Sequence, residues 1–596
     1  MLFRSYLSKQ QARSFTVPVN GIKLEAKDGE TIMELCDRNH IKIPRLCHHP
    51  NLPPKASCRV CLVECNNSWF SAACVTPVYN GLSVNTKSNK VRDAVKQNLG
   101  MLLESHDERC TSCVAAERCQ FRDLTDDFGV TARIRRKPEP KCIDNSTHSI
   151  RFDPGKCVLC GRCIRACESI VGSKSIHFAN RGNRMVVQPT AGVTLEKSTC
   201  IKCGQCTLYC PVGAMTEKSQ AQEVLEELRK VSKNEKVCII EKSSLVDIAQ
   251  ALGYQKGVIN AGQVIAALKA LGFSMVVDAS VGNDILIDLE AENLVKMLKN
   301  SKAKFPVYAS NCSGFVNFVE QSHASIMKQL SANRSSAAII SGLIKNQDTK
   351  PKELPDGSEQ IYTVYIGSCT AKKDEIKRPE LAADGLRNTD VALTTRELVQ
   401  MIKSARIQVH KLGECNFDHV YGEATGDGSL AYVTGGLAES VARATYHKMT
   451  GKVLPAIEFK ELLGYKSVRV ADVKIGAKVV KFAAVDQIHD ALDLINKIEK
   501  KDPSVSDIKY VEVTACPGGC VAGGGSAYPE NGETIQKRIN EIYSIKNNAF
   551  YRDNSESYAV KNLPLGEVQE LLQATFKARP KRSEERRVGK ECRSRW

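Results

Sequence analysis

The chain carries 25 cysteines in 596 residues, and most of them fall in the short spacings that metal clusters use. The first set is Cys47, Cys58, Cys61 and Cys74, with gaps of ten, two and twelve residues. Four thiolates on loops of these lengths can hold a [2Fe–2S] cluster. Zinc is the alternative for closely spaced cysteine pairs, but the cluster motifs that follow favour iron and sulfide. We therefore expect a [2Fe–2S] site near the N-terminus.

A histidine stands at the head of the next cysteine run. His106 is followed by Cys110, Cys113 and Cys119, in a segment expected to be helical on its N-terminal side. One imidazole and three thiolates complete the four ligands of a [4Fe–4S] cluster. Because neutral histidine donates less charge than thiolate, this cluster should have a higher reduction potential than an all-cysteine cluster. We predict that His106 is a ligand.

Eight further cysteines form two runs with the same gaps of two, two and three residues. This is the pattern of two-cluster bacterial ferredoxins, in which the fourth cysteine of each run binds the other cluster. One [4Fe–4S] cluster is expected on Cys157, Cys160, Cys163 and Cys210, and the other on Cys200, Cys203, Cys206 and Cys167. With the preceding sets, the sequence predicts a relay of one [2Fe–2S] and three [4Fe–4S] clusters.

The second half of the chain is of a different kind. Strand-like runs such as residues 362–366 and 510–514 alternate with helix-like runs such as 395–404, which predicts an α/β domain with a mostly parallel sheet. Cysteines are sparse there but fall at the ends of expected strands, at Cys312, Cys369, Cys516 and Cys520. Glycines 518, 519 and 523 to 525 let the backbone approach a bulky cofactor closely.

Two kinds of protein have cluster modules in this order. The first half resembles the large NADH-oxidising subunit of respiratory complex I and also the N-terminal half of long-form [FeFe]-hydrogenases. The second half resembles only the [FeFe]-hydrogenase catalytic domain, so a complex I-like electron carrier is the minor alternative. The resemblance covers nearly all of residues 17–576. The motifs on which the resemblance rests are SNCSGFVNFVE (310–320), GSCTAKKDE (367–375), DVALTTRELVQMIK (390–403), TGGLAESVARATY (434–446) and ACPGGCVAGGG (515–525).

The resemblance implies a cofactor and a reaction. Cys312, Cys369, Cys516 and Cys520 would hold the [4Fe–4S] part of the H-cluster, and Cys520 would also bridge to a diiron unit with CO, CN and dithiolate ligands. The implied activity is that of a ferredoxin hydrogenase, which reversibly reduces protons to dihydrogen with electrons from reduced ferredoxin. The residues expected to act in catalysis are Cys520, Lys372, which in the family contacts a cyanide ligand, Glu290 and Asn311.

The sequence departs from the family pattern where the chemistry would occur. Asn311 replaces a cysteine that serves as terminal proton donor, and an amide has no usable pKa near neutrality. Of two glutamates in the family proton path, Glu290 fits the first and Asn293 stands at the second. The departures around the diiron unit are Gly367 and Ser368 for methionine and proline, Thr514 for methionine, residues 241–245 (EKSSL) for Ala-Pro-Ala-Val-Arg, and Ala338 for glutamine.

Because of these departures, two other functions are alternatives to the hydrogenase prediction. The chain is alternatively a catalytically impaired redox or sensory protein that keeps the cluster relay. A scaffold of cytosolic iron–sulfur assembly is the third hypothesis, and the [2Fe–2S] and His-ligated modules weaken it because such a scaffold does not need a relay.

The motifs divide a chain that is longer than one hydrophobic core usually serves. The predicted fold is multidomain α/β, with ferredoxin-like modules before the catalytic domain. The expected parts are a targeting presequence (1–16), a β-grasp [2Fe–2S] ferredoxin-like domain (17–93), a His-ligated [4Fe–4S] domain (94–135), a 2[4Fe–4S] ferredoxin domain (147–222), an H-cluster domain (235–545), a segment like the hydrogenase small subunit (546–576) and a basic disordered tail (577–596).

Composition and charge bear on location and partners. No apolar run is long enough to span a membrane. Of the net charge of +17, the tail 577–596 supplies +6. The remaining +11 suits acidic electron-transfer partners or a solvated basic surface, and we expect no nucleic-acid partner. The expected partners are ferredoxin or an NADH-oxidising pair as electron donor, and hydrogenase maturation proteins. Arg4, Lys9 and Arg13, with no acid before Glu25, predict targeting to a hydrogenosome or mitochondrion-related organelle, the alternative being the cytoplasm.

Overall fold

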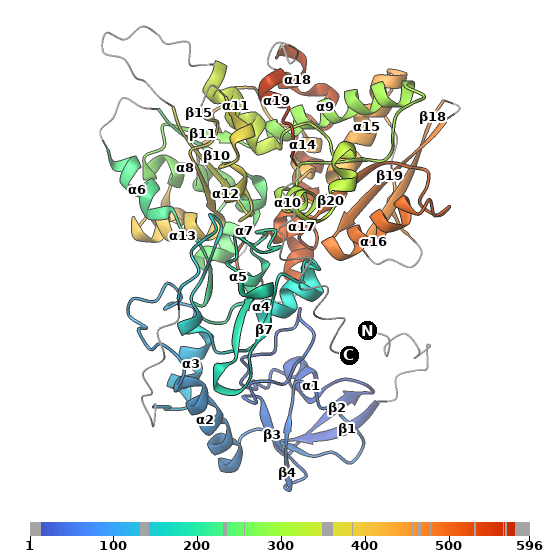
Figure 1. Cartoon of the computed structure of the whole chain (residues 1–596). Coiled ribbons are helices and arrows are strands. Elements are labelled where there is room, and N and C mark those ends of the chain that lie inside the picture. The colour runs from blue at the N-terminus through green and yellow to red at the C-terminus, as the bar shows by residue number, and fades with distance from the viewer. Residues whose placement is uncertain are drawn as a thin grey trace.

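The computed structural model describes residues 14–577, except 132–141, 231–234, 256, 348–360, 384–385, 455–456, 463–466, 477, 530–531, 564–565 and 567–568. The expected presequence, apart from its last three residues, and the expected tail, apart from Lys577, lie outside the described residues. The cysteine-rich modules form one end of the molecule and the α/β domain forms the other (Figure 1).

The N-terminal module is a small mixed sheet with one helix. Its strands are β1 (Ser14–Val19), β2 (Ile22–Lys27), β3 (Leu62–Cys65), β4 (Trp69–Ala72) and β5 (Val84–Asn85), and its helix is α1 (Ile32–Arg38). The strand order is β2-β1-β5-β3-β4, with β1 and β5 parallel. Asn20 and Gly21 both have positive φ, which suits the tight turn between β1 and β2. The sheet begins at Ser14, three residues before the expected boundary.

The next two modules hold the [4Fe–4S] motifs. The first contains α2 (Asn89–Leu103) and α3 (Gln120–Asp127); the second contains β6 (Ile150–Phe152), α4 (Arg162–Arg165), β7 (Ile176–Ala179), β8 (Val186–Pro189), α5 (Gln205–Tyr209) and β9 (Met215–Glu217). Helices α4 and α5 each begin after a glycine with positive φ, Gly161 and Gly204. The two cysteine runs therefore start their helices in the same way, as their matched spacing predicts. Helix α6 (Ala221–Arg229) leads into the α/β domain.

Two sheets organise the α/β domain. The first, in the order β11-β10-β13-β16, is wholly parallel, and the second, in the order β12-β20-β19-β18-β17, is parallel only from β12 to β19. The prediction of a mostly parallel sheet is thus correct for the first sheet. The strands are β10 (Lys236–Ile240), β11 (Met275–Asp278), β12 (Val307–Tyr308), β13 (Tyr362–Gly367), β14 (Ala382–Ala383), β15 (Leu386–Arg387), β16 (Val391–Thr394), β17 (Lys460–Glu461), β18 (Val468–Ile475), β19 (Lys478–Asp486) and β20 (Ile508–Thr514).

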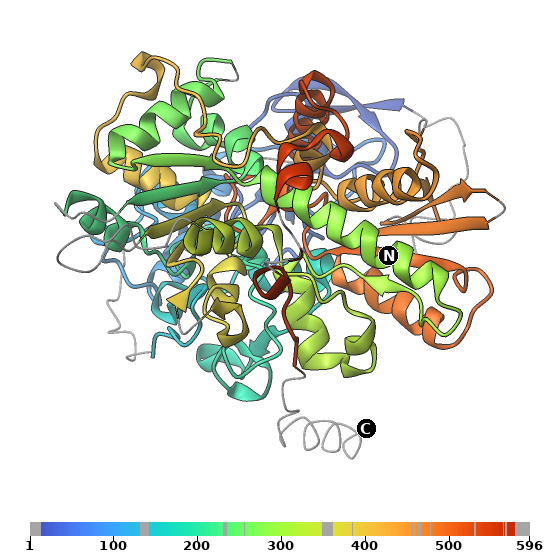
Figure 2. The same ribbon diagram turned by 90° about the horizontal axis from the view of Figure 1, so that it is seen from above.

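Helices cover both sheets of this domain. They are α7 (Lys242–Leu252), α8 (Ala261–Leu271), α9 (Ser280–Lys299), α10 (Ser313–Ser322), α11 (Ser336–Gln347), α12 (Lys372–Glu375), α13 (Thr395–Ser404), α14 (Gly426–Leu430), α15 (Gly436–Thr450), α16 (Ile488–Glu499), α17 (Gly532–Asn548), α18 (Tyr558–Asn562) and α19 (Gln569–Leu572). Helix α9 crosses the region between the two sheets (Figure 2), and its apolar side chains share one buried cluster with residues of β10, β11, β19 and β20. Among the described residues, no helix is both long and apolar enough to cross a membrane.

The C-terminal segment is part of the α/β domain. Helix α17 runs through the expected boundary at residue 545, and farther on the chain passes along residues 332–334. There the Arg334 amide donates to the Leu572 carbonyl (2.7 Å), and the Ala574 amide donates to the Ala332 carbonyl (2.8 Å). The expected small-subunit-like segment therefore packs against the segment that follows α10.

Candidate functional site

The four cysteines of the N-terminal motif converge in two pairs. Cys47, Cys61 and Cys74 are buried and Cys58 is half-buried. The Cys47 amide donates to the Cys58 sulfur at 3.4 Å, and a hydrogen bond between the two thiols lowers the pKa of Cys47. Cys61 and Cys74 share a thiol hydrogen bond in the same way, which lowers the pKa of Cys74. The structure therefore brings the four predicted [2Fe–2S] ligands together.

The histidine and cysteines of the second motif surround a hollow. His106, Cys110 and Cys119 line a cavity of about 410 Å³. The His106 ring packs edge-on against Phe121, with centroids 5.2 Å apart, and burial lowers its pKa. Its buried Nδ1 atom has no hydrogen-bond partner in the described part of the chain. A buried neutral imidazole facing two thiols suits a metal cluster. Cys113 lies close by but turns toward the next module, beside Gly213.

The eight ferredoxin-type cysteines group across the two runs. Cys210 lies with Cys157, Cys160 and Cys163 around one hollow. In the second group, burial raises the pKa of Cys206 and the neighbouring charges of Cys200 and Cys167 raise it further. Cys210 thus lies with the first run, and Cys167 lies near Cys200 and Cys206 of the second, as the predicted crossed pairing requires.

Backbone amides point at sulfur atoms throughout these sites. The sulfurs of Cys157, Cys167 and Cys210 accept from the amides of Leu159 (3.4 Å), Ser175 (3.3 Å) and Met215 (3.4 Å). Such amides stabilise the negative charge of a bound, reduced cluster.

Buried Arg165 joins the [2Fe–2S] module to the two-cluster module. Its guanidinium donates to the carbonyls of Cys47 (2.5 Å) and Cys160 (3.4 Å), which belong to two different cluster loops, and to that of Pro53. Two predicted clusters are therefore neighbours.

The cysteines of the α/β domain come together at strand and helix ends. Cys312 precedes α10, Cys369 follows β13, and Cys516 and Cys520 follow β20. Burial raises the pKa of Cys516 to about 12, and the charge of Cys312 adds to the rise. Burial likewise raises the pKa values of Cys369 and Cys520, and in both cases the other cysteines contribute. Four closely spaced thiols form a donor set that fits a [4Fe–4S] cluster.

The second ferredoxin cluster loop lies directly against this site. A Cβ atom at Gly524 would lie 2.1 Å from the Cys203 carbonyl oxygen and 2.6 Å from the Gly204 Cα atom, so the two backbones touch. The Gln205 side chain also donates to the Ala522 carbonyl (2.7 Å). Only glycine permits this approach at position 524.

An ion pair fastens the same junction. Buried Arg396 donates to both carboxylate oxygens of Glu217, at 3.0 and 2.8 Å. It also donates to the carbonyls of Gly524 and Ser526, both at 2.8 Å. Glu217 belongs to the two-cluster module and the other partners belong to the α/β domain. Spacing rules gave no sign of this contact.

The residues expected in a proton path are placed as follows. Glu290 is buried in α9 and accepts from Ser331 (2.5 Å) and Asn333 (2.9 Å), and burial raises its pKa. The Asn311 side-chain oxygen accepts from the Ser336 amide (3.1 Å). Asn293 is half-buried farther along α9.

The positions around the expected diiron unit are polar. The Lys372 ammonium, buried, donates to Glu375 (2.7 Å), and the Thr514 hydroxyl bonds to that of Thr434 (2.7 Å). Buried Glu241 takes the space beside Gly367. The sequence signal for this contact was a pair of size changes relative to the family pattern. Glycine stands in place of methionine at 367, and glutamate stands in place of alanine at 241. Ala338 lies elsewhere, in a small cluster with Leu381 and Ala574.

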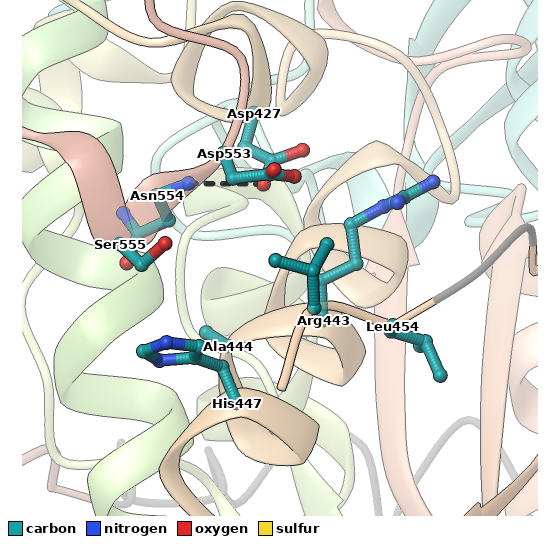
Figure 3. A pocket seen from close by; sticks show the side chains of 9 residues that line it. Asp427, Arg443, Ala444, His447, Leu454, Asp553, Asn554 and Ser555 are labelled. Carbon is teal, nitrogen blue, oxygen red and sulfur yellow. Dashed lines mark hydrogen bonds between the residues drawn. The ribbon is translucent and has the colours of Figure 1, made fainter. Parts of the chain in front are cut away.

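A separate hollow lies away from the cysteines. It is lined by Asp427, Arg443, His447, Asp553 and Asn554, together with other residues of α15, of the loop that follows it and of the C-terminal segment (Figure 3). The Asn554 amide donates to the Asp427 carboxylate at 3.1 Å, as the dashed line in Figure 3 marks. This hollow therefore marks where the C-terminal segment is fastened to α14.

Family models match both halves of the chain. Residues 234–524 match the iron only hydrogenase large subunit, C-terminal domain. Residues 12–89 match a 2Fe-2S iron-sulfur cluster binding domain, residues 96–133 the NADH-ubiquinone oxidoreductase-G iron-sulfur binding region, and residues 193–216 a 4Fe-4S binding domain. The two halves thus match in the order that the motifs predict.

Similar proteins extend over nearly the whole chain. The NADP-reducing hydrogenase subunit HndD of Solidesulfovibrio fructosivorans is 30% identical, over 89% of this chain and 92% of its own. Iron hydrogenase 1 of Clostridium pasteurianum is 30% identical, over 91% of this chain and 95% of its own. A solved [FeFe]-hydrogenase structure superposes with a TM-score of 0.54 at 25% identity, over 60% of this chain and 99% of that one.

Proposed function

Since this chain belongs to the iron-only hydrogenase family, we propose that it is an oxidoreductase that passes electrons from reduced ferredoxin through one [2Fe–2S] and three [4Fe–4S] clusters to the buried four-cysteine site. The observation that carries the proposal is the contact between the loop of Cys203 and the loop of Gly524. It puts the last predicted cluster of the relay against the segment that holds Cys516 and Cys520.

Charge and similarity support two kinds of electron donor. The net charge of +17 would speed the encounter with an acidic ferredoxin. One similar protein is named as a subunit of an NADP-reducing hydrogenase, which supports a partner that exchanges electrons with a pyridine nucleotide. Ferredoxin is our first choice, and the NADH-oxidising partner pair is the alternative.

Reversible reduction of protons to dihydrogen is one candidate for the reaction at the end of the relay. The family membership, the four gathered cysteines and the buried Lys372 support it. Hydrogenase maturation proteins would have to deliver the diiron part of the H-cluster. When it is bound, the H-cluster would supply the metal centre at which protons and electrons combine.

A redox or sensory protein that keeps the relay without forming gas is the other candidate, and the geometry supports it better. The Asn311 oxygen accepts a hydrogen bond and its amide cannot hand on a proton as a thiol can. Glu290 remains, but the carboxylate expected at position 293 is an amide. Proton delivery to the four-cysteine site is therefore interrupted at two places.

A reduction experiment tests the electron relay. The protein is reconstituted anaerobically with iron and sulfide, reduced with ferredoxin and examined by electron paramagnetic resonance. We expect the signals of the relay clusters and of the four-cysteine cluster to appear together. Cys203→Ser should prevent reduction of the four-cysteine cluster while the [2Fe–2S] signal remains. If ferredoxin leaves the clusters oxidised, the proposal fails.

A gas assay separates the two candidate reactions. Hydrogen release is measured with reduced methyl viologen after loading with the diiron unit. Release at rates of a working hydrogenase would support the first candidate, and its absence from a protein whose clusters are reduced would support the second.

The location is a separate proposal. The basic residues Arg4, Lys9 and Arg13 support an organellar presequence in a hydrogenosome or mitochondrion-related organelle. Residues 1–30 fused to a fluorescent protein should enter that organelle, and the combined changes Arg4→Glu, Lys9→Glu and Arg13→Glu should leave the fusion in the cytoplasm.

A further inference from the structure

We infer that Glu241 sets the cofactor specificity of the four-cysteine site, so that the site takes a [4Fe–4S] cluster with Cys520 as its fourth ligand and excludes the diiron unit. The inference rests on the proposed function, because it concerns what the relay ends on. It follows from the position of one carboxylate, from the donors that fix it, and from the charges that face it.

Strand pairing brings Glu241 to the edge of the site. Glu241 follows β10, and its amide donates to the Ile366 carbonyl of the parallel strand β13 (2.9 Å). Its side chain then lies over Gly367, where an added Cβ atom would be 2.7 Å from the carboxylate carbon and 2.9 and 3.0 Å from its oxygens. A methionine at 367, as in the family pattern, cannot coexist with the Glu241 carboxylate in its present position. The carboxylate therefore occupies space that the family gives to a side chain beside the diiron unit.

Three donors hold the carboxylate in place. The Ser243 hydroxyl donates to it at 2.6 Å and the Ser368 amide at 3.3 Å, and the Tyr365 hydroxyl donates to its other oxygen. Glu241 is 3% exposed, so water does not compete for these bonds. Because Ser368 is the neighbour of Cys369, the carboxylate is tied to the backbone beside a cluster ligand. It cannot swing away to admit a second metal unit without breaking buried hydrogen bonds.

The surrounding hydroxyls are also committed to one another. The Ser368 hydroxyl donates to that of Ser243 (3.3 Å), and the Thr395 hydroxyl donates to that of Ser244 (2.9 Å). These polar groups stand where the family pattern has a proline at 368 and apolar residues at 243 and 244. These hydroxyls therefore bond to one another on the side of the site where the family pattern has apolar residues.

The charges facing Glu241 oppose a second anionic group. The nearby cations are already paired, Lys372 with Glu375 at 2.7 Å and Lys242 with Asp278 at 3.0 Å. On the other side lie Cys520 and Cys369, which bind a cluster as negatively charged thiolates. Cyanide and dithiolate ligands carry negative charge. Placing them beside a buried carboxylate, where Lys372 and Lys242 are already paired, adds repulsion in a medium of low dielectric constant.

The test is loading with a synthetic diiron compound that bears CO, CN and dithiolate ligands. Protein reconstituted with iron and sulfide is incubated with the compound, desalted, and examined by infrared spectroscopy and iron analysis. For the unaltered chain we expect no retained CO or CN bands and no change in iron per chain. For the double variant Glu241→Ala, Gly367→Met we expect both sets of bands and about two more iron atoms per chain.

Controls separate specificity from folding. Glu461→Ala removes an exposed carboxylate on β17 and should behave as the unaltered chain. Glu241→Gln keeps the side-chain size and removes the charge, and should retain a fraction of the compound. Circular dichroism and the paramagnetic signals of the relay show whether each variant is folded.

Two results would overturn the inference. The first is retention of CO and CN bands, with two added iron atoms, by the unaltered chain. The second is no retention by either Glu241 variant when both are folded and carry their clusters. Failure of ferredoxin to reduce the clusters would instead refute the proposed relay function, and it leaves the infrared result unaffected.

Discussion

Replacing Arg396 by methionine would show how strongly the junction between the two-cluster module and the α/β domain depends on one buried ion pair. The substitution keeps an unbranched apolar stem, shortens the side chain, and removes its charge and all its donors. Glu217 would lose its partner at 2.8 Å, and the carbonyls of Gly524 and Ser526 would each lose a hydrogen bond.

The magnitude follows from the pKa of Glu217. Burial by itself would raise this pKa, but the charge and hydrogen bonds of Arg396 outweigh burial and lower it from 4.5 to about 2. At about 1.4 kcal/mol per pH unit, the difference corresponds to about 3 kcal/mol. Removing one partner of a buried pair typically costs 3–5 kcal/mol, because the other charge stays buried. We therefore expect Arg396→Met to reduce the free energy of unfolding by roughly 3 to 5 kcal/mol at pH 7.

The sign of the pH dependence is fixed by the lowered pKa. Between about pH 2 and 4.5 the unfolded chain binds a proton at Glu217 that the folded chain does not. The contribution of the pair is therefore complete above pH 4.5 and is lost as the pH falls through that range. Between pH 5 and 8 the contribution of the Glu217–Arg396 pair to the stability of the unaltered chain should stay constant.

The assay is urea unfolding at pH 7, followed by circular dichroism and by the visible absorbance of the clusters. A double-mutant cycle with Glu217→Gln isolates the pair, and Arg396→Lys keeps the charge while losing the forked geometry. The reasoning is refuted if Arg396→Met costs less than about 1 kcal/mol, or if the losses of the two single variants simply add.

Three other perturbations have defined outcomes. Gly524→Ala puts a Cβ atom 2.1 Å from the Cys203 carbonyl oxygen and so forces the two loops apart. In stopped-flow experiments it should slow reduction of the four-cysteine cluster at least tenfold. An unchanged rate would contradict electron transfer through this contact. Burial raises the pKa of Asp284 to about 7, so the folded chain retains a proton there and loses about 4 kcal/mol of stability as the pH rises from 3.8 to 7. Asp284→Asn should flatten this dependence, as unfolding measured across the range would show. His106→Cys adds a negative ligand and should lower the reduction potential of its cluster by roughly 100 to 300 mV in a redox titration, whereas an unchanged potential would exclude His106 as a ligand.

The cysteine spacing predicted the cluster modules because the ligands of each cluster lie close together in the sequence. A gap of two residues places two thiols on one turn of backbone, whatever the rest of the fold does. The crossing of Cys210 and Cys167 between the two runs was predictable for a related reason, since the two runs repeat one local structure. The strand ends at Cys369 and Cys516 followed from the apolar runs before them.

Contacts between distant segments could not be predicted in this way. Glu241 meets Gly367 only because β10 and β13 pair in parallel with one particular register. Arg396 meets Glu217 only because the two-cluster module docks on α13. Both contacts depend on tertiary packing, for which the sequence carries no local signal. The single hint was the exchange of residue sizes at positions 241 and 367, which has meaning only once the two are known to touch.

The contact between Gly524 and Cys203 has a consequence for biosynthesis. The ribosome completes the loop of Cys203 about 300 residues before it reaches Gly524, which is roughly 15 to 60 s at ordinary rates of translation. During that time the loop lacks the cover that it has in the finished protein, and the strand that carries Cys516 does not yet exist. A cluster inserted at the Cys203 loop during synthesis would therefore stay uncovered on that side until the segment of Gly524 is made and folds onto it.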